Sequence, residues 1–149
     1  MVGVNRADGN VLRETYKAAK GSADMIKGLV SKTEDEDLSM DLNRQLGQYQ
    51  KFLQGARMQL QREGQKPAAE GNFEKAKFWL ELQAGTMLNN STQHIANMVI
   101  EENAKGMGNL IRVLKDNQTA RNEYCEFANE LMDFTESSIN QLKYYLKVL

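Results

Sequence analysis

Four long stretches of this chain carry apolar residues at alternating spacings of three and four, a pattern typical of helices packed in a bundle. In the first stretch, residues 10–32, the stripe is formed by Leu12, Tyr16, Ala19, Ala23, Ile26 and Val30. In the second, the same rhythm is formed by Leu42, Leu46, Tyr49, Leu53, Ala56 and Leu60. The 149 residues include a single proline, Pro67, so proline interrupts none of these stretches. The sequence therefore predicts an almost wholly helical, all-α chain.

Helix ends can be read from the residues that separate the stretches. The acidic segment 31–37 offers Ser31 or Thr33 as the N-cap of the second helix, and its acids suit the positive end of a helix dipole. Gly64 and Pro67 are expected to end that helix, because glycine favours the C-terminal cap and proline cannot continue a helix. The first connection is therefore short, and short connections join antiparallel neighbours.

The second connection is long. A third helix is expected over about 89–116 and a fourth over about 118–147, so residues 65–88 separate the second helix from the third. A segment of this length can carry the chain back along the bundle, so that the second and third helices run parallel. One long connection between two short ones is the pattern of a ferritin-like four-helix bundle, here with a short crossover helix within 65–88. The alternative is an up-down-up-down bundle, which needs no such segment.

Composition indicates one domain over 1–149, in which residues 1–8 are expected to fray. Lys and Arg number 19 against 20 Asp and Glu, a net charge of −1, so no surface for nucleic acid or for an anionic membrane is predicted. No stretch approaches membrane-spanning length, and the first residues lack the apolar segment of a secretory signal. The lone cysteine, Cys125, fits a reducing compartment. The chain is therefore expected in the cytoplasm.

The order of these features resembles that of a known family. Two long helices precede a short apolar segment with the W-x-x-L pattern of Trp79 and Leu82, and the third long helix carries Glu102-Asn103-Ala104 near its middle. This order is similar to that of small bacterial ferritin-like proteins related to bacterioferritin, many of them of unassigned function. The resemblance spans nearly the whole chain and implies a closed bundle that frequently forms homo-oligomers. In active relatives it also implies a di-iron carboxylate centre.

The ligands of a standard di-iron centre are nevertheless missing from the sequence. Such a centre needs inward-facing carboxylates from two helices and a Glu-x-x-His pair from each of the other two. Glu-x-x-His does not occur, and the second helix has neither acid nor histidine between Asp41 and Glu63. The polar residues expected on its core side are Gln45, Gln50 and Arg57. The acids that fall off the apolar stripes of the first and fourth helices are Glu14, Asp24, Glu123, Glu126, Glu130, Asp133 and Glu136. No metal or cofactor is therefore predicted; the alternative is iron or manganese held in part by Glu102.

Residues 91–103 contain the only histidine, His94, followed by the adjacent acids Glu101 and Glu102. Because each residue advances about 100° around a helix, His94 and Glu101 are expected on the polar face. Glu102 and Asn103 border the apolar face, where a polar group costs free energy unless it is hydrogen-bonded. The side chains expected to satisfy this buried pair are Tyr16, Tyr49, Tyr124, Thr135 and Ser138. Such a network would fix the register of the helices; the alternative takes Glu102 as the remnant of a ferritin-like carboxylate.

Two aromatic residues and two glycines complete the set of features. Phe78 and Trp79 are expected either to lay the crossover helix onto the bundle or to form part of a dimer interface. Gly106 and Gly108 each cost a helix about 1 kcal/mol relative to alanine, which indicates close helix contact or a bend.

Three functions follow from these observations. The first is a non-catalytic ferritin-like bundle that acts as a structural or protein-interaction module, most simply as a homodimer with an unknown protein partner. The second is a divergent metal-binding oxidoreductase centred on Glu102. The third is a carrier of an apolar ligand in the bundle core. Because the di-iron ligand set is absent, we expect the chain not to be an enzyme.

Overall fold

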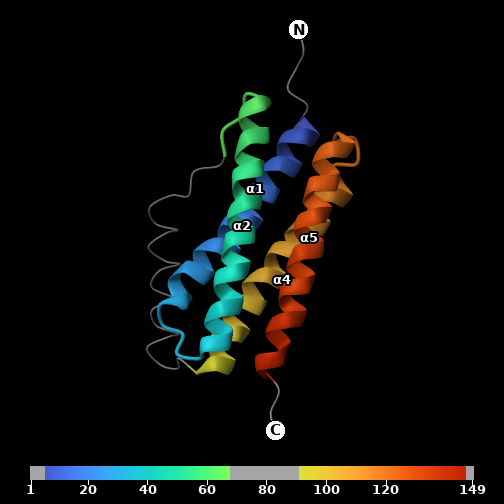
Figure 1. Cartoon of the computed structure of the whole chain (residues 1–149). Coiled ribbons are helices and arrows are strands. Elements are labelled where there is room, and N and C mark those ends of the chain that lie inside the picture. The colour runs from blue at the N-terminus through green and yellow to red at the C-terminus, as the bar shows by residue number, and fades with distance from the viewer. Residues whose placement is uncertain (1–5, 68–90, 147–149) are drawn as a thin grey trace, which may run out of the picture.

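The computed structural model describes residues 6–67 and 91–146, and these residues form helices joined by turns, without a strand. Four α-helices pack into a bundle (Figure 1): α1 Arg6–Val30, α2 Glu36–Arg62, α4 Thr92–Asp116 and α5 Asn122–Leu142. A short 3₁₀ helix, η1 Lys143–Leu146, follows α5 directly. The helical bundle predicted from the apolar spacing is confirmed. Phe78, Trp79 and most of the expected crossover segment lie outside the described residues.

The directions of the helices can be followed in Figure 1. The N-terminal end of α1 lies at the same end of the bundle as the C-terminal end of α2, and α4 runs in the same direction as α2. The last helix, α5, returns antiparallel to α4. An up-down-up-down bundle would instead place α2 and α4 antiparallel, since consecutive helices alternate there.

Local signals explain where the helices begin and end. The N-cap of α2 is Asp35, whose carboxylate accepts a hydrogen bond from the Leu38 N–H at 2.9 Å, so the expectation of Ser31 or Thr33 is wrong. Thr33 instead donates its hydroxyl hydrogen to the Leu29 carbonyl at the end of α1, at 2.8 Å. After α2, Gly64 adopts φ +69, a left-handed conformation that glycine reaches without strain. This confirms Gly64 as the glycine at the end of the helix, directly after the C-cap Glu63.

The start of α1 corrects one expectation. Residues 1–8 were expected to fray, yet α1 begins at Arg6. Ala7 and Asp8 are both buried. Residues 1–5 lie outside the described part of the chain. The expectation fails for the first turn of α1 because Asp8 binds another part of the bundle, as described below.

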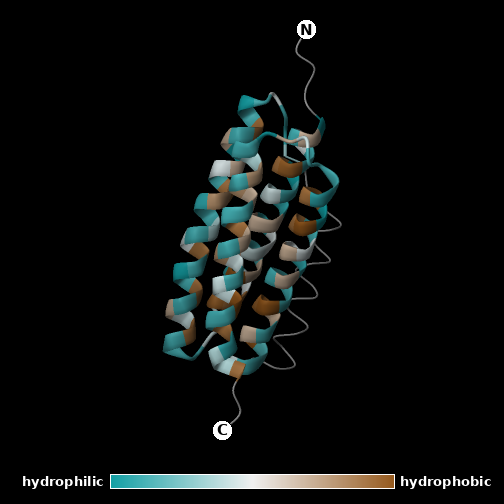
Figure 2. Cartoon of the chain, turned by 90° about the vertical axis from the view of Figure 1, so that its right-hand side faces the viewer, coloured by the Kyte–Doolittle hydropathy of each residue, from teal (hydrophilic) through white to brown (hydrophobic). Residues whose placement is uncertain are grey.

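The core fills the space between the four helices. Its largest fully buried side chains are Tyr49, Tyr124, Leu12, Ile26, Leu29, Leu38, Leu42, Leu60, Ile95, Leu110 and Leu131. Figure 2 shows the more hydrophobic residues mainly on the inner sides of the helices and the hydrophilic residues over most of the outside. Removal of this apolar surface from water is the main favourable term in folding. Among the described helices, none combines the length and the apolar character needed to cross a membrane.

Candidate functional site

A group of polar side chains is buried in the bundle, with a contribution from every α-helix. Ser22 comes from α1, Tyr49 from α2, Asn103 from α4, and Thr135 and Ser138 from α5; all five are buried. We call these five residues the polar layer. They occupy positions on the apolar stripes of their helices, which is why they point inward.

Hydrogen bonds connect the members of the polar layer. The Ser22 hydroxyl donates to the Asn103 side-chain oxygen at 2.7 Å, and the Tyr49 hydroxyl lies 3.4 Å from the Thr135 Oγ1. Burial raises the pKa of Tyr49, while hydrogen bonds with Thr135, Ser138 and Ser22 act in the opposite direction. The Tyr49 phenol therefore stays neutral at physiological pH and lies among the hydroxyls of α1 and α5.

Asn103 is the member of the polar layer with unused hydrogen-bonding capacity. Its side chain is fully buried, as predicted, and its oxygen accepts from Ser22. Its Nδ2 has no hydrogen-bond partner among the described residues. A buried N–H without a partner costs about 1–3 kcal/mol, so this amide is held in the core against a desolvation penalty. The sequence predicted the burial of Asn103 but missed its partner Ser22.

Glu102 is partly buried, which agrees with its predicted position at the border of the apolar face, and it is less buried than Asn103. It faces Gly21 of α1, where a Cβ atom would lie 3.2 Å from the Glu102 Oε2. Burial raises the pKa of the Glu102 carboxyl and Asp24 adds to this, whereas Lys105 lowers it. Gly21 thus provides the space in which a half-buried carboxylate can lie between α1 and α4.

Two tyrosines expected near Glu102 and Asn103 have other surroundings. The Tyr124 hydroxyl donates to the Glu63 carboxylate, and burial together with this bond raises the pKa of Tyr124 to about 12. Tyr16 is buried, and the Arg57 guanidinium lies 5.9 Å from the centre of its ring. Neither hydroxyl hydrogen-bonds to Glu102 or Asn103 in the described residues. Of the three tyrosines, only Tyr49 belongs to the polar layer.

An ionic cluster at the end of the bundle was missed by the sequence reasoning. Asp8 is fully buried and accepts a hydrogen bond from the Arg121 backbone N–H at 2.8 Å. The Arg121 side chain lies 3.4 Å from the Asp8 carboxylate and 3.4 Å from that of Glu63. One guanidinium thus joins α1, the end of α2 and the start of α5. The sequence did indicate that Asp8 is buried, because it lies four residues before Leu12 and so on the same apolar stripe of the helix.

The histidine that stood out in the sequence has a mixed environment. Glu101 is exposed, as predicted, and accepts a hydrogen bond from Asn97 Nδ2 at 3.0 Å. His94 was expected on the polar face but is partly buried, and its Nε2 is buried without a partner among the described residues. Ser91 caps the helix by accepting from the His94 backbone N–H at 3.2 Å. His94 and Glu101 would supply only two metal ligands, fewer than the three or more that a metal site in a protein uses.

The donor atoms in the centre of the bundle do not fit a di-iron centre. The five acids of the fourth helix named above are exposed, as predicted from its stripe. Of the polar residues expected on the core side of α2, only Gln45 is buried, whereas Gln50 and Arg57 are exposed. The polar layer consists of hydroxyls and one amide, while di-iron proteins of this type use carboxylates and histidines. Within the described ranges no cluster of three or more His, Cys, Asp or Glu side chains is arranged to hold a metal.

A comparison of the chain with models of known protein families finds no matching family. Searches of curated proteins and of solved structures likewise give no match.

Proposed function

We propose that this chain is a non-catalytic bundle of ferritin-like arrangement that serves as a structural or protein-interaction module. The observation that carries the proposal is the neutral polar layer. Its hydroxyl and amide groups come from all four helices and are buried, whereas a di-iron protein needs inward-facing carboxylates. Hydrogen bonds between such groups fix the register of helices, which is a structural role.

Two further observations support the ferritin-like arrangement and the absence of thiol chemistry. The parallel course of α2 and α4 is the geometry that a single long crossover produces (Figure 1).

Burial raises the pKa of the Cys125 thiol, and the charge of Asp8 raises it further. A thiol of raised pKa is a poor nucleophile, so Cys125 does not match the reactive thiol of a cysteine enzyme.

Metal analysis tests the non-catalytic proposal. Protein produced with added iron and manganese is expected to retain metal only in substoichiometric amounts, and Glu102→Ala is expected to leave that amount unchanged. Glu101→Ala, one residue away and exposed, is the matched control. Stoichiometric metal that disappears in Glu102→Ala, but not in Glu101→Ala, would support the divergent oxidoreductase instead.

The assembly is proposed to be a homodimer, as the resemblance to ferritin-like proteins implies. Large apolar side chains that are exposed on the described surface and available for such contacts are Met40, Met58, Ile111 and Tyr144. Light scattering coupled to size-exclusion chromatography is expected to give twice the chain mass of 16.9 kDa. A mass equal to one chain at all concentrations would remove the dimer from the proposal and leave the bundle.

A further inference from the structure

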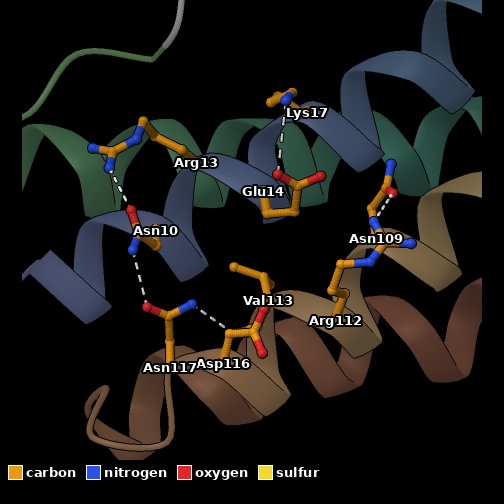
Figure 3. Close-up of a pocket in the computed structure, with 9 residues that line it drawn as sticks. All are labelled: Asn10, Arg13, Glu14, Lys17, Asn109, Arg112, Val113, Asp116 and Asn117. Carbon is orange, nitrogen blue, oxygen red and sulfur yellow. Dashed lines mark hydrogen bonds and ion pairs between the residues drawn. The ribbon is translucent and has the colours of Figure 1, made fainter.

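A groove of about 510 Å³ runs along the surface between α1 and the C-terminal half of α4 (Figure 3). This volume lies within the range of sites that bind small molecules. Three cations, two carboxylates, three asparagines and one valine line the groove. It is separate from the polar layer, which lies in the interior of the bundle.

The two arginines of the groove are oriented by amides rather than by carboxylates. Arg13 donates through Nη2 to the Asn10 side-chain oxygen at 2.9 Å and through Nη1 to the Gln65 side-chain oxygen. Arg112 donates through Nη1 to the Asn109 side-chain oxygen at 3.1 Å. In the described part of the chain, no ion pair involves either arginine. An amide oxygen holds a guanidinium in place without cancelling its charge, and each guanidinium carries five N–H donors.

The other charged groups of the groove leave a net positive charge. Glu14 lies 3.7 Å from Lys17, and these two opposite charges offset each other. Asp116 is the second carboxylate, so three cations face two acids. Asn10 also donates to Asn117 at 2.9 Å, and Asn117 donates to the Val113 carbonyl at 2.7 Å. These bonds join α1 to the end of α4 and hold one end of the groove in a fixed shape.

We propose that this groove binds a small anion with carboxylate or phosphate groups, held by the guanidinium groups of Arg13 and Arg112. Guanidinium forms paired, charge-assisted hydrogen bonds with both kinds of group. Figure 3 shows the two arginine side chains towards opposite ends of the groove, with Val113 and the Glu14 carboxylate in the part between them. This arrangement favours a ligand with two acidic groups or with an acidic group and a short apolar part. The site is independent of the function proposed above.

Isothermal titration with succinate and with inorganic phosphate tests the site and distinguishes the two acidic groups. At least one of the two is expected to bind saturably. Arg112→Gln and Arg13→Gln are each expected to weaken succinate binding by about tenfold, since each removes a charge-assisted pair. A single phosphate group is expected to lose about tenfold with one of the two variants, because the arginines lie towards opposite ends of the groove (Figure 3). Arg57→Gln is the matched control, because Arg57 is an exposed arginine on α2 that does not line the groove. Circular dichroism establishes that each variant remains folded.

A variant that removes a negative charge tests the groove in the opposite direction, while the Arg57→Gln control identifies a general charge effect. Asp116→Asn removes one of the two acids of the groove and is expected to tighten anion binding by a few-fold, because a nearby like charge is lost. The proposal is overturned if neither probe binds saturably, if Arg57→Gln weakens binding as much as the stronger of Arg112→Gln and Arg13→Gln, or if Asp116→Asn weakens it. Binding of phosphate alone would identify a phosphate-bearing ligand, and binding of succinate alone a carboxylate-bearing one.

Discussion

The two interfaces on opposite sides of the bundle are packed by opposite means. Between α1 and α4 the backbones come close, and small residues lie at the contact: Ala18, Gly21, Ser22 and Gly106, with Asn103 hydrogen-bonded to Ser22. We call this the small-residue interface. Between α2 and α5 the backbones stay farther apart, and aromatic rings fill the space: Tyr49, Phe52, Phe127 and Phe134. We call this the aromatic interface.

The difference predicts how each interface responds to a change in volume. A Cβ atom on Gly106 would already lie 3.4 Å from the Ala18 Cβ and 3.7 Å from the Ala18 Cα, so a larger side chain must push a helix backbone. A Cβ atom on Gly55 would lie 2.8 Å from the Phe127 Cζ, which is the far end of a side chain that can turn away. Added atoms should therefore damage the small-residue interface, and removed atoms should damage the aromatic one.

The largest effect is expected for Gly106→Leu. Forcing α1 and α4 apart should lower the free energy of unfolding by about 3 kcal/mol, the upper part of the range for an overpacked core. The matched control is Gly108→Leu on the same helix, where the added Cβ meets no described atom within 4 Å. Replacement of glycine there should stabilise the helix by up to about 1 kcal/mol. Urea unfolding followed by circular dichroism measures both, and equal effects would refute the close approach of α1 and α4.

The aromatic interface should lose most when a ring is removed. The Phe134 ring lies 5.0 Å from that of Tyr49 and 5.9 Å from that of Phe52. Because Phe134 is partly buried, Phe134→Ala should cost about 2 kcal/mol, less than the 3–5 kcal/mol of a fully buried ring. Gly55→Ala should change the free energy of unfolding by less than about 1 kcal/mol, since the gain in helix propensity offsets the shift of Phe127. A larger loss from Gly55→Ala than from Phe134→Ala in the same urea assay would contradict the comparison.

An intermediate effect is expected for the hydrogen bond across the small-residue interface. Ser22→Ala and Asn103→Ala should each cost about 1–3 kcal/mol, because each leaves a buried polar partner unpaired. The double variant should cost less than the sum of the two by at least about 0.5 kcal/mol, which is the sign of direct coupling. Additive losses in the thermodynamic cycle would show that the 2.7 Å bond does not stabilise the bundle.

The smallest effect concerns the charge of Glu102 at the edge of the small-residue interface. The pKa of the Glu102 carboxyl is raised in the folded protein, chiefly by burial. Between the ordinary pKa of glutamate and this raised pKa, the folded state therefore binds more protons than the unfolded state. Stability from this group is therefore greatest at low pH and is lost across that window. Glu102→Gln removes the titration, so its advantage over the natural protein should grow from about pH 4 to about pH 7. Glu101→Gln, on the exposed neighbour, should show no such growth in urea unfolding at the same pH values.

Much of the architecture was predictable because it depends on the local spacing of apolar residues. The apolar stripes that include Leu12 and Leu42 predicted α1 and α2. The angular position of Asn103 around its helix predicted its burial. It was not predictable which buried side chains hydrogen-bond to one another, because the distance between helices depends on side chains that are far apart in the sequence. Ser22 and Asn103 are separated by 81 residues, and only the small residues around them bring α1 close enough to α4 for a hydrogen bond. Tyr124 faces the core as expected, but its partner Glu63 comes from the end of another helix.

The Asp8 carboxylate has a consequence for the order in which the chain can complete its structure. Arg121, the N-cap of α5, forms no side-chain cap of its own, and its backbone N–H is satisfied by a residue 113 positions earlier. A ribosome releases Asp8 long before it releases Arg121, so the carboxylate remains hydrated until the last helix emerges. The beginning of the chain and its final helix are therefore completed together. Deletion of the first turn of α1 should therefore speed the amide hydrogen exchange at the start of α5, at the opposite end of the sequence.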